Sequence, residues 1–154
     1  MENSRRFDII ATGTGRCGTK FVAELLTSVG VKCLHETFFT PYGLGYAYRM
    51  ITEGHWTGTR AESSWQAAPY LQDDLLRGAF VIHLVRHPKE FIESVLKVWP
   101  ADGHTPWTTF AQTIIPSLKQ YENDRPTWLA HRYAAWNQMI EAPSIVTGKH
   151  TIRS

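Results

Sequence analysis

The chain has little of what marks exported, membrane-bound or nucleic-acid-binding proteins. Its 154 residues include only two cysteines, Cys17 and Cys33, whose spacing gives no metal motif such as C-x-x-C. The net charge is only +2, and the longest basic run is the pair at positions 5–6, far too little for binding DNA or RNA through backbone electrostatics. No apolar run reaches the length of a membrane span. We therefore expect a protein that binds neither nucleic acid nor a membrane.

The length and the N-terminal residues set the next expectations. A chain of 154 residues can bury one proper core but is too short for two, so we expect a single domain over residues 1–154. Residues 1–6 are polar and lead directly into a strand-like run, which is unlike a signal peptide. A cytoplasmic location with free thiols is the expectation that follows.

Strand-like and helix-like segments alternate along the chain. Apolar runs at 7–12, 31–35 and 80–85 are typical of buried strands, and apolar residues at helical spacing follow the first and third of them, at 19–29 and 88–99. This alternation predicts an α/β fold of three layers, with a central, mostly parallel sheet flanked by helices.

The remaining elements are assigned from caps and breakers. In the first helix, an i, i+1, i+4, i+5, i+8 pattern marks one apolar face, made by Phe21, Val22, Leu25, Leu26 and Val29. Proline and glycine positions delimit further segments. These are a helix near 42–52, a strand at 60–65, a short helix at 69–76, a helix from 105–106 broken at Pro116, a helix from Pro126, and a final strand at 149–154.

A glycine-rich turn, residues 13–20 (GTGRCGTK), joins the first strand to the first helix. This architecture binds phosphate, because backbone N–H groups point into the turn and the helix N-terminus adds partial positive charge. A Walker A loop requires lysine directly after the second glycine, but Thr19 stands there. The glycines also match the dinucleotide pattern G-x-G-x-x-G, with Glu36 near the place of its companion acid, so that interpretation stays open.

Residues 16–19 (RCGT) resemble the 5′-phosphosulfate loop of sulfotransferases, in which a basic residue, a small residue, Gly and Thr open the first helix. The resemblance implies that Arg16 takes the place often filled by lysine, and that Cys17 replaces a common serine without loss of its backbone role. The residues implied in holding the 5′ end of 3′-phosphoadenosine 5′-phosphosulfate are Gly15, Arg16, Cys17, Gly18, Thr19 and Lys20.

A second motif follows the strand at 80–85. Its Val-Arg-x-Pro end and the serine eight residues after Arg86, which is Ser94, resemble the 3′-phosphate motif of the same family. A phosphate there needs a forked cation and a hydroxyl donor on rigid elements. Two simpler interpretations stay open: Arg86 pairs with a surface acid, and Ser94 is an exposed helix residue. Strand ends of a parallel sheet converge on one crevice, so both motifs can reach one nucleotide.

Catalytic candidates follow the strand at 31–35. Transfer of a sulfuryl group needs a base for the acceptor proton and cations for the leaving phosphate. Arg16 is the candidate cation for the leaving phosphate. The candidate base is Glu36 by its position, with His35 as its close competitor, although Glu36 could instead cap the next helix.

The resemblance implies a P-loop-NTPase-like sulfotransferase fold, with 3′-phosphoadenosine 5′-phosphosulfate as co-substrate and no metal. The acceptor would be a hydroxyl or amine of a small molecule or a glycan, bound near the aromatic segment 41–58, and homo-oligomerisation stays open. Many family members carry a C-terminal Gly-rich basic segment that is not visible here, so the chain is interpreted as a compact variant or a truncated piece. A P-loop-type nucleotide kinase and a non-catalytic nucleotide-binding module are the alternatives.

Overall fold

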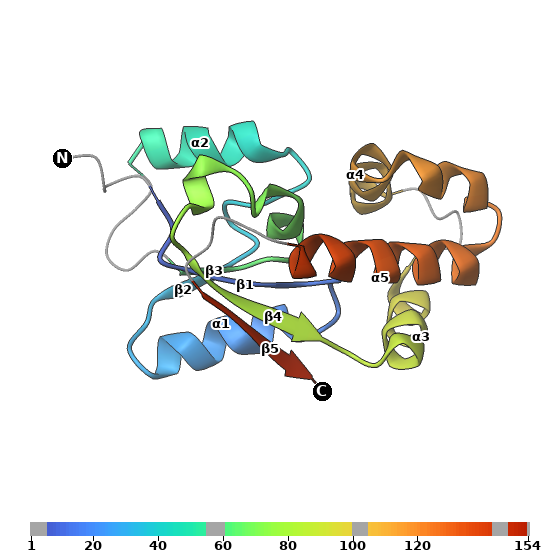
Figure 1. Cartoon of the computed structure of the whole chain (residues 1–154), viewed down its shortest axis with the longest axis horizontal. Coiled ribbons are helices and arrows are strands. Elements are labelled where there is room, and N and C mark those ends of the chain that lie inside the picture. The colour runs from blue at the N-terminus through green and yellow to red at the C-terminus, as the bar shows by residue number, and fades with distance from the viewer. Residues whose placement is uncertain (1–5, 55–60, 100–104, 143–147, 154) are drawn as a thin grey trace.

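The computed structural model describes residues 6–54, 61–99, 105–142 and 148–153, and these form an α/β fold around a parallel sheet (Figure 1). Every strand pair in the sheet is parallel, and the strand order is β2-β3-β1-β4-β5. The strands are β1 Ile9–Gly13, β2 Cys33–His35, β3 Ala61–Ser63, β4 Phe80–Val85 and β5 Gly148–Arg153. The predicted α/β class and parallel sheet are confirmed.

Helices cover both faces of the sheet, with α1 on one side and α2 and α5 on the other (Figure 1). Neighbouring residues of β1 point to opposite layers: Ile10 belongs to the large core with Trp136 of α5, while Ala11 packs with Val22 of α1. The helices are α1 Thr19–Ser28, α2 Leu44–Thr52, α3 Pro88–Val98, α4 Pro106–Ile114 and α5 Arg125–Glu141, and the 3₁₀ turns are η2 Trp65–Tyr70, η3 Asp74–Leu76 and η4 Pro116–Tyr121. No helix of the described residues is long and apolar enough to cross a membrane.

The sheet order separates this fold from the dinucleotide-binding one. In the order 3-2-1-4-5-6 the first strand lies beside the second. Here β1 pairs with β3 and β4, so β2 and the nearby Glu36 are one strand removed from β1. The dinucleotide interpretation therefore does not fit. The carboxyl ends of β1 and β4 lie side by side, with Gly13 opposite Leu84.

Two sequence predictions about local structure are wrong. The first concerns α1, where Phe21, Leu25 and Val29 are 65%, 48% and 69% exposed. The predicted face is thus correct only for Val22 and Leu26, which pack against the sheet together with Thr19 and Ala23. The second concerns 69–76, which holds the end of η2 and all of η3 in place of one helix, with Pro69 inside the first 3₁₀ turn.

The other predicted elements are present. Helix α3 buries Phe91 and Val95, and α5 buries Leu129, Trp136 and Ile140, as their spacing indicates. Helix α4 begins at Pro106 with a capping box made by Thr105 and Thr108, and ends before Pro116. The predicted C-terminal strand is β5, paired with β4.

Gly13 and Gly45 give a matched pair of glycine-to-alanine changes. A Cβ at Gly13 would lie 2.3 Å from the Leu84 carbonyl oxygen and 2.6 Å from Cys17 Sγ, whereas one at exposed Gly45, in α2, would meet nothing within 4 Å. We expect Gly13→Ala to lower the free energy of unfolding by about 2 kcal/mol through overpacking. Gly45→Ala should raise it by about 0.5 kcal/mol through helix propensity. Urea unfolding measures both, and equal stability of the two variants would contradict this packing.

Candidate functional site

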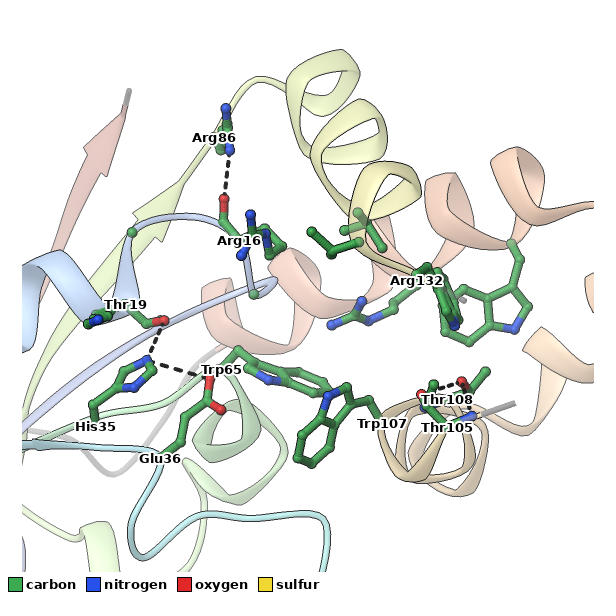
Figure 2. A pocket seen from close by; sticks show the side chains of 17 residues that line it. Arg16, Thr19, His35, Glu36, Trp65, Arg86, Thr105, Trp107, Thr108 and Arg132 are labelled. Atoms are coloured by element: carbon green, nitrogen blue, oxygen red, sulfur yellow. Dashed lines mark hydrogen bonds and ion pairs between the residues drawn. The ribbon is translucent and has the colours of Figure 1, made fainter. Parts of the chain in front are cut away.

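A cleft of about 690 Å³ lies at the carboxyl ends of β1, β2 and β4 (Figure 2). Its walls combine the glycine-rich turn, the end of β2 and a group of aromatic side chains from η2, α3, α4 and α5. The lining residues are Gly15, Arg16, Gly18, Thr19, Lys20, His35, Glu36, Trp65, Arg86, Val95, Val98, Trp99, Thr105, Trp107, Thr108, Trp128 and Arg132. Most of the predicted site residues thus line one cavity.

The glycine-rich turn leaves the N-terminus of α1 open to this cleft. Gly15 and Gly18 have φ of 78° and 96°, and Arg16 between them has φ 52°. Gly18 is the N-cap residue, and no side chain caps the helix. The first N–H groups of a helix need partners from outside it, and an anion is a favourable one. The turn is therefore shaped to receive a negatively charged group.

Cys17 supports the turn by packing and does not face the cleft. Its side chain is buried with Ala11, Val22 and Leu84. Burial raises the pKa of its thiol to about 11, so the group is neutral at physiological pH. A neutral, enclosed thiol is a poor nucleophile. Cys17 therefore fills volume beneath the turn and does not line the cleft, while the backbone role implied for it stays a prediction.

The two predicted anion motifs contact each other directly. Arg86 Nη1 donates a hydrogen bond to the main-chain oxygen of Arg16 at 3.0 Å (Figure 2). Arg16 Nε donates to Ser94 Oγ at 3.2 Å, so Ser94 reaches the site through Arg16 without lining the cleft itself. Arg86 also pairs with Glu90 at 3.3 Å, an exposed ion pair one helical turn away. The surface-acid interpretation of Arg86 is thus true alongside its place in the cleft.

His35 and Glu36 stand beside the turn, at the end of β2. His35 Nε2 lies 3.1 Å from Thr19 Oγ1 and 3.6 Å from Glu36 Oε1. Burial raises the pKa of the Glu36 carboxyl, while the neighbouring His35 opposes that rise. Glu36 has φ 49°, and it and Arg16 are the two non-glycine residues at positive φ in the described part of the chain. Such backbone strain costs about 1–3 kcal/mol per residue and gathers at functional sites.

Glu62 of β3 fixes the turn that follows Glu36. Its Oε1 accepts hydrogen bonds from the backbone N–H groups of Thr37, Phe38 and Phe39, at 2.9, 2.8 and 3.1 Å. The Glu62 side chain is fully buried, and this burial raises its pKa to about 7. The prediction that Glu36 could cap the following helix is wrong, because α2 begins only at Leu44 with Gly43 as its N-cap.

The aromatic end of the cleft differs from the expectation for residues 41–58. None of the described residues 41–54 lines it, and 55–58, including His55 and Trp56, lie outside the described residues. Indole rings take this place instead, those of Trp65, Trp99, Trp107 and Trp128. One sequence signal for them was available, since six tryptophans are many for 154 residues and Trp65 and Trp107 lie outside the most regular helical patterns.

Arg132 of α5 is a cleft residue that sequence analysis missed. It is only 7% exposed, and its Nη2 donates to the Thr14 carbonyl oxygen at 2.7 Å. Its guanidinium carbon lies 4.4 Å from the centroid of the Trp65 ring. Position 132 falls between Leu129 and Trp136 on the apolar face of the helix. A cation on such a face is the signal that could have identified it.

Other polar candidates are structural or exposed. His83 is fully buried and bonds Asn137 Oδ1 at 2.9 Å, as a core histidine should. Lys20 pairs with Glu24 one turn along α1, and its side chain is 78% exposed. Among the described residues, no three His, Cys, Asp or Glu side chains gather as a metal site, and His104 lies outside them.

Comparison with known proteins assigns no family to the chain: no protein-family model and no curated protein matches it.

The buried Glu62 carboxyl makes stability depend on pH. Because burial raises its pKa from 4.5 to about 7, the folded protein holds a proton there that the unfolded chain has released, and stability falls as pH rises across this window. Glu62→Gln keeps the shape without the charge. We expect this variant to gain up to about 3 kcal/mol over the wild type between pH 5 and 8. Urea unfolding at several pH values measures the difference.

The matched control is Glu24→Gln, which neutralises a carboxyl 65% exposed on α1. That variant should follow the wild type at every pH. A difference between the wild type and Glu62→Gln that does not change with pH would contradict a proton held on Glu62.

Proposed function

We propose that this chain is a sulfotransferase, which moves a sulfuryl group from 3′-phosphoadenosine 5′-phosphosulfate to a hydroxyl or amine of an acceptor. One observation carries the proposal: both anion motifs and the candidate base lie in one cleft, joined by the hydrogen bonds of Arg16 with Arg86 and Ser94. The P-loop-NTPase-like sulfotransferase fold is part of the same proposal, and the all-parallel sheet supports it.

The donor would bind across the joined motifs. Its 5′ end would receive hydrogen bonds from the open N-terminus of α1 and from Arg16, whose side chain is exposed at the cleft. Its 3′-phosphate would take Arg86 and Ser94, with the phosphate replacing Glu90 as the partner of the Arg86 guanidinium. A bidentate arginine–phosphate contact is stronger than an exposed ion pair, so this exchange is favourable.

The transfer step is an in-line displacement at sulfur. The acceptor oxygen or nitrogen forms a bond to sulfur as the bond from sulfur to the 5′-phosphate oxygen breaks, and that electron pair stays on the phosphate. Glu36 takes the acceptor proton, and Arg16 stabilises the charge on the leaving phosphate. The raised pKa of Glu36 and its strained backbone support it over His35, whose Nε2 is already close to Thr19 Oγ1.

The acceptor, a small molecule or a glycan, would lie at the aromatic end of the cleft. Trp65 and Trp107 lie between Glu36 and the pair Thr105–Thr108 (Figure 2). The hydroxyls of Thr105 and Thr108 bond each other in the capping box. An aromatic ring is therefore the main surface that an acceptor can contact here. Trp65 is only 6% exposed and is covered by Arg132 and Trp136, whereas Trp107 is 50% exposed. A ring-shaped acceptor can therefore stack on the Trp107 indole with its reactive group directed toward Glu36.

Two alternatives are less well supported. A P-loop-type kinase holds its magnesium with acidic or hydroxyl ligands beside the phosphate loop. Glu36 is the sole carboxylate among the described lining residues, and Thr19 stands where the phosphate loop of such a kinase has lysine. A non-catalytic nucleotide-binding module needs Arg86 and Ser94 but gains nothing from a strained, desolvated glutamate at the cleft.

Arg86→Gln tests donor binding. We expect it to weaken the affinity for adenosine 3′,5′-bisphosphate about 10- to 100-fold, because a charge-assisted phosphate contact contributes about 1.5–3 kcal/mol. Titration calorimetry measures the change. Arg49→Gln is the matched control, since Arg49 pairs with Glu53 at i,i+4 outside the cleft. Equal affinities for the two variants, or a wild type that prefers ATP with Mg²⁺ or NAD, would exclude this donor site.

Glu36→Gln tests catalysis separately from binding. The variant should hold adenosine 3′,5′-bisphosphate within about twofold of wild type while losing about 10²–10⁴-fold in transfer rate, the usual contribution of a general base. Release of adenosine 3′,5′-bisphosphate from the sulfated donor, with a panel of phenols and sugars, measures turnover. Wild-type kcat should rise with pH through the raised Glu36 pKa, because the base must be ionised.

Glu53→Gln, an exposed acid at the end of α2, is the control for that series. Unchanged turnover in Glu36→Gln would transfer the role of base to His35. A wild type that binds the nucleotide yet turns over none of the panel, with no effect of Glu36→Gln, would favour the non-catalytic module.

A further inference from the structure

Arg132 is a buried cation without a carboxylate partner among the described residues. The ion pairs of the described residues do not include it, and its only hydrogen bond there is the one to the Thr14 carbonyl oxygen. Its Nε is among the buried nitrogen atoms that have no hydrogen-bond partner in this part of the chain. A guanidinium has five N–H donors, so most of its capacity is unused.

Aromatic rings offset part of the cost of burying this charge. The Arg132 guanidinium carbon lies 4.4 Å from the ring centroid of Trp65, 5.4 Å from that of Trp136, and 5.7 Å and 5.9 Å from those of Phe91 and Trp128. Burial lowers the pKa of Arg132 to about 10, so the group is still charged at neutral pH. A desolvated charge that lacks a counter-ion binds an anion more strongly than an exposed one does.

The location of this charge indicates which anion it meets. A Cβ built on Gly15 would lie 3.4 Å from Arg132 Nη2 and 3.3 Å from Trp65 Cγ, so the phosphate turn rests on both side chains. Figure 2 shows the Arg132 guanidinium pointing toward the part of the cleft between Arg16 and Trp65. This part of the cleft lies between the glycine-rich turn and the indole rings.

We propose that Arg132 binds the sulfuryl group of the donor, as a second cation opposite Arg16. The inference rests on the proposed function. With the 5′-phosphate on the turn and the acceptor among the indoles, the group between them is the one transferred. Negative charge on the sulfuryl oxygens would then receive N–H donors that are already in place and shielded from water.

A purely structural role for Arg132 makes a different prediction. If the side chain only holds the Thr14 carbonyl oxygen and covers Trp65, its loss would disturb the turn for every ligand that uses it. Affinity for the desulfated nucleotide would then fall as much as affinity for the donor. A sulfuryl-binding role affects the donor selectively, so the ratio of the two affinities is the quantity to measure.

The experiment compares dissociation constants for adenosine 3′,5′-bisphosphate and 3′-phosphoadenosine 5′-phosphosulfate in the absence of acceptor, by calorimetry. In Arg132→Met we expect donor affinity to fall at least 10-fold while bisphosphate affinity changes less than about threefold. Arg132→Lys keeps the charge without the fork and should lie between. If Arg132→Met does not fold, the ratio of donor affinity to bisphosphate affinity is measured in Arg132→Lys and Arg132→Gln instead. Parallel losses for both ligands, or no loss, overturn the proposal.

Arg125→Met is the matched control on the same helix. Arg125 also lies over an indole, 5.3 Å from the Trp99 centroid, and its Nη2 also donates to a main-chain carbonyl oxygen, at 3.3 Å, but it does not line the cleft. Its loss should leave the affinity ratio unchanged. A ratio that shifts in Arg125→Met as much as in Arg132→Met would overturn the assignment.

Inorganic sulfate separates failure of this inference from failure of the proposed function. A wild type that binds neither nucleotide contradicts the proposed function. Thermal unfolding in a sulfate series, against chloride at equal ionic strength, then decides on Arg132 alone. A sulfate-dependent rise in Tm that Arg132→Met loses and Arg125→Met keeps supports an anion site at Arg132, and equal shifts in all three proteins reject it.

Discussion

The hydrogen bond from Arg86 to the main-chain oxygen of Arg16 is the contact on which the site depends. It exists because β1 and β4 are neighbours in register, with Gly13 opposite Leu84, so the turns after both strands meet at one edge of the sheet. Gly13 is required there, since any side chain would collide with the Leu84 carbonyl oxygen. The pairing of two strands thus brings together two cations that are 70 residues apart in the chain.

Several features that lower the stability of the protein lie around the contact between Arg86 and Arg16. Arg16 and Glu36 have positive φ, the Glu36 carboxyl is desolvated, and Arg132 is a buried charge. Each costs free energy in the unliganded protein, and each faces or borders the same cleft. One oxygen of the Glu62 carboxyl holds the turn after Glu36 in place by accepting three backbone hydrogen bonds, although burial of this carboxyl has a cost of its own. Strain of this kind fits a site prepared for charged ligands, as the proposed transfer requires.

The sequence predicted most of the polar residues that line this cleft, because the signals that mark them are local. Glycines with Arg16 between a strand and a helix indicate an anion turn, and Arg86 after an apolar strand indicates a second. The spacing of apolar residues also predicted the buried faces of α3 and α5. The buried face of α1 was predicted only in part, because two apolar rows lie side by side and only the approach of the sheet decides between them. The prediction of one helix over residues 69–76 was wrong for a similar reason, since tertiary packing selects 3₁₀ turns there.

By itself, then, the sequence determined the α/β class, and it predicted the two turns proposed to bind anions and the candidate base, since each follows from residues close together in the chain. Only the tertiary structure decided the strand order, which places β3 between β1 and β2 and excludes the dinucleotide arrangement. It also decided that indoles line the far end of the cleft and that Arg132 lies beneath the turn. The reason is physical: a contact such as Arg132 with Thr14 spans 118 residues, and no local pattern encodes it.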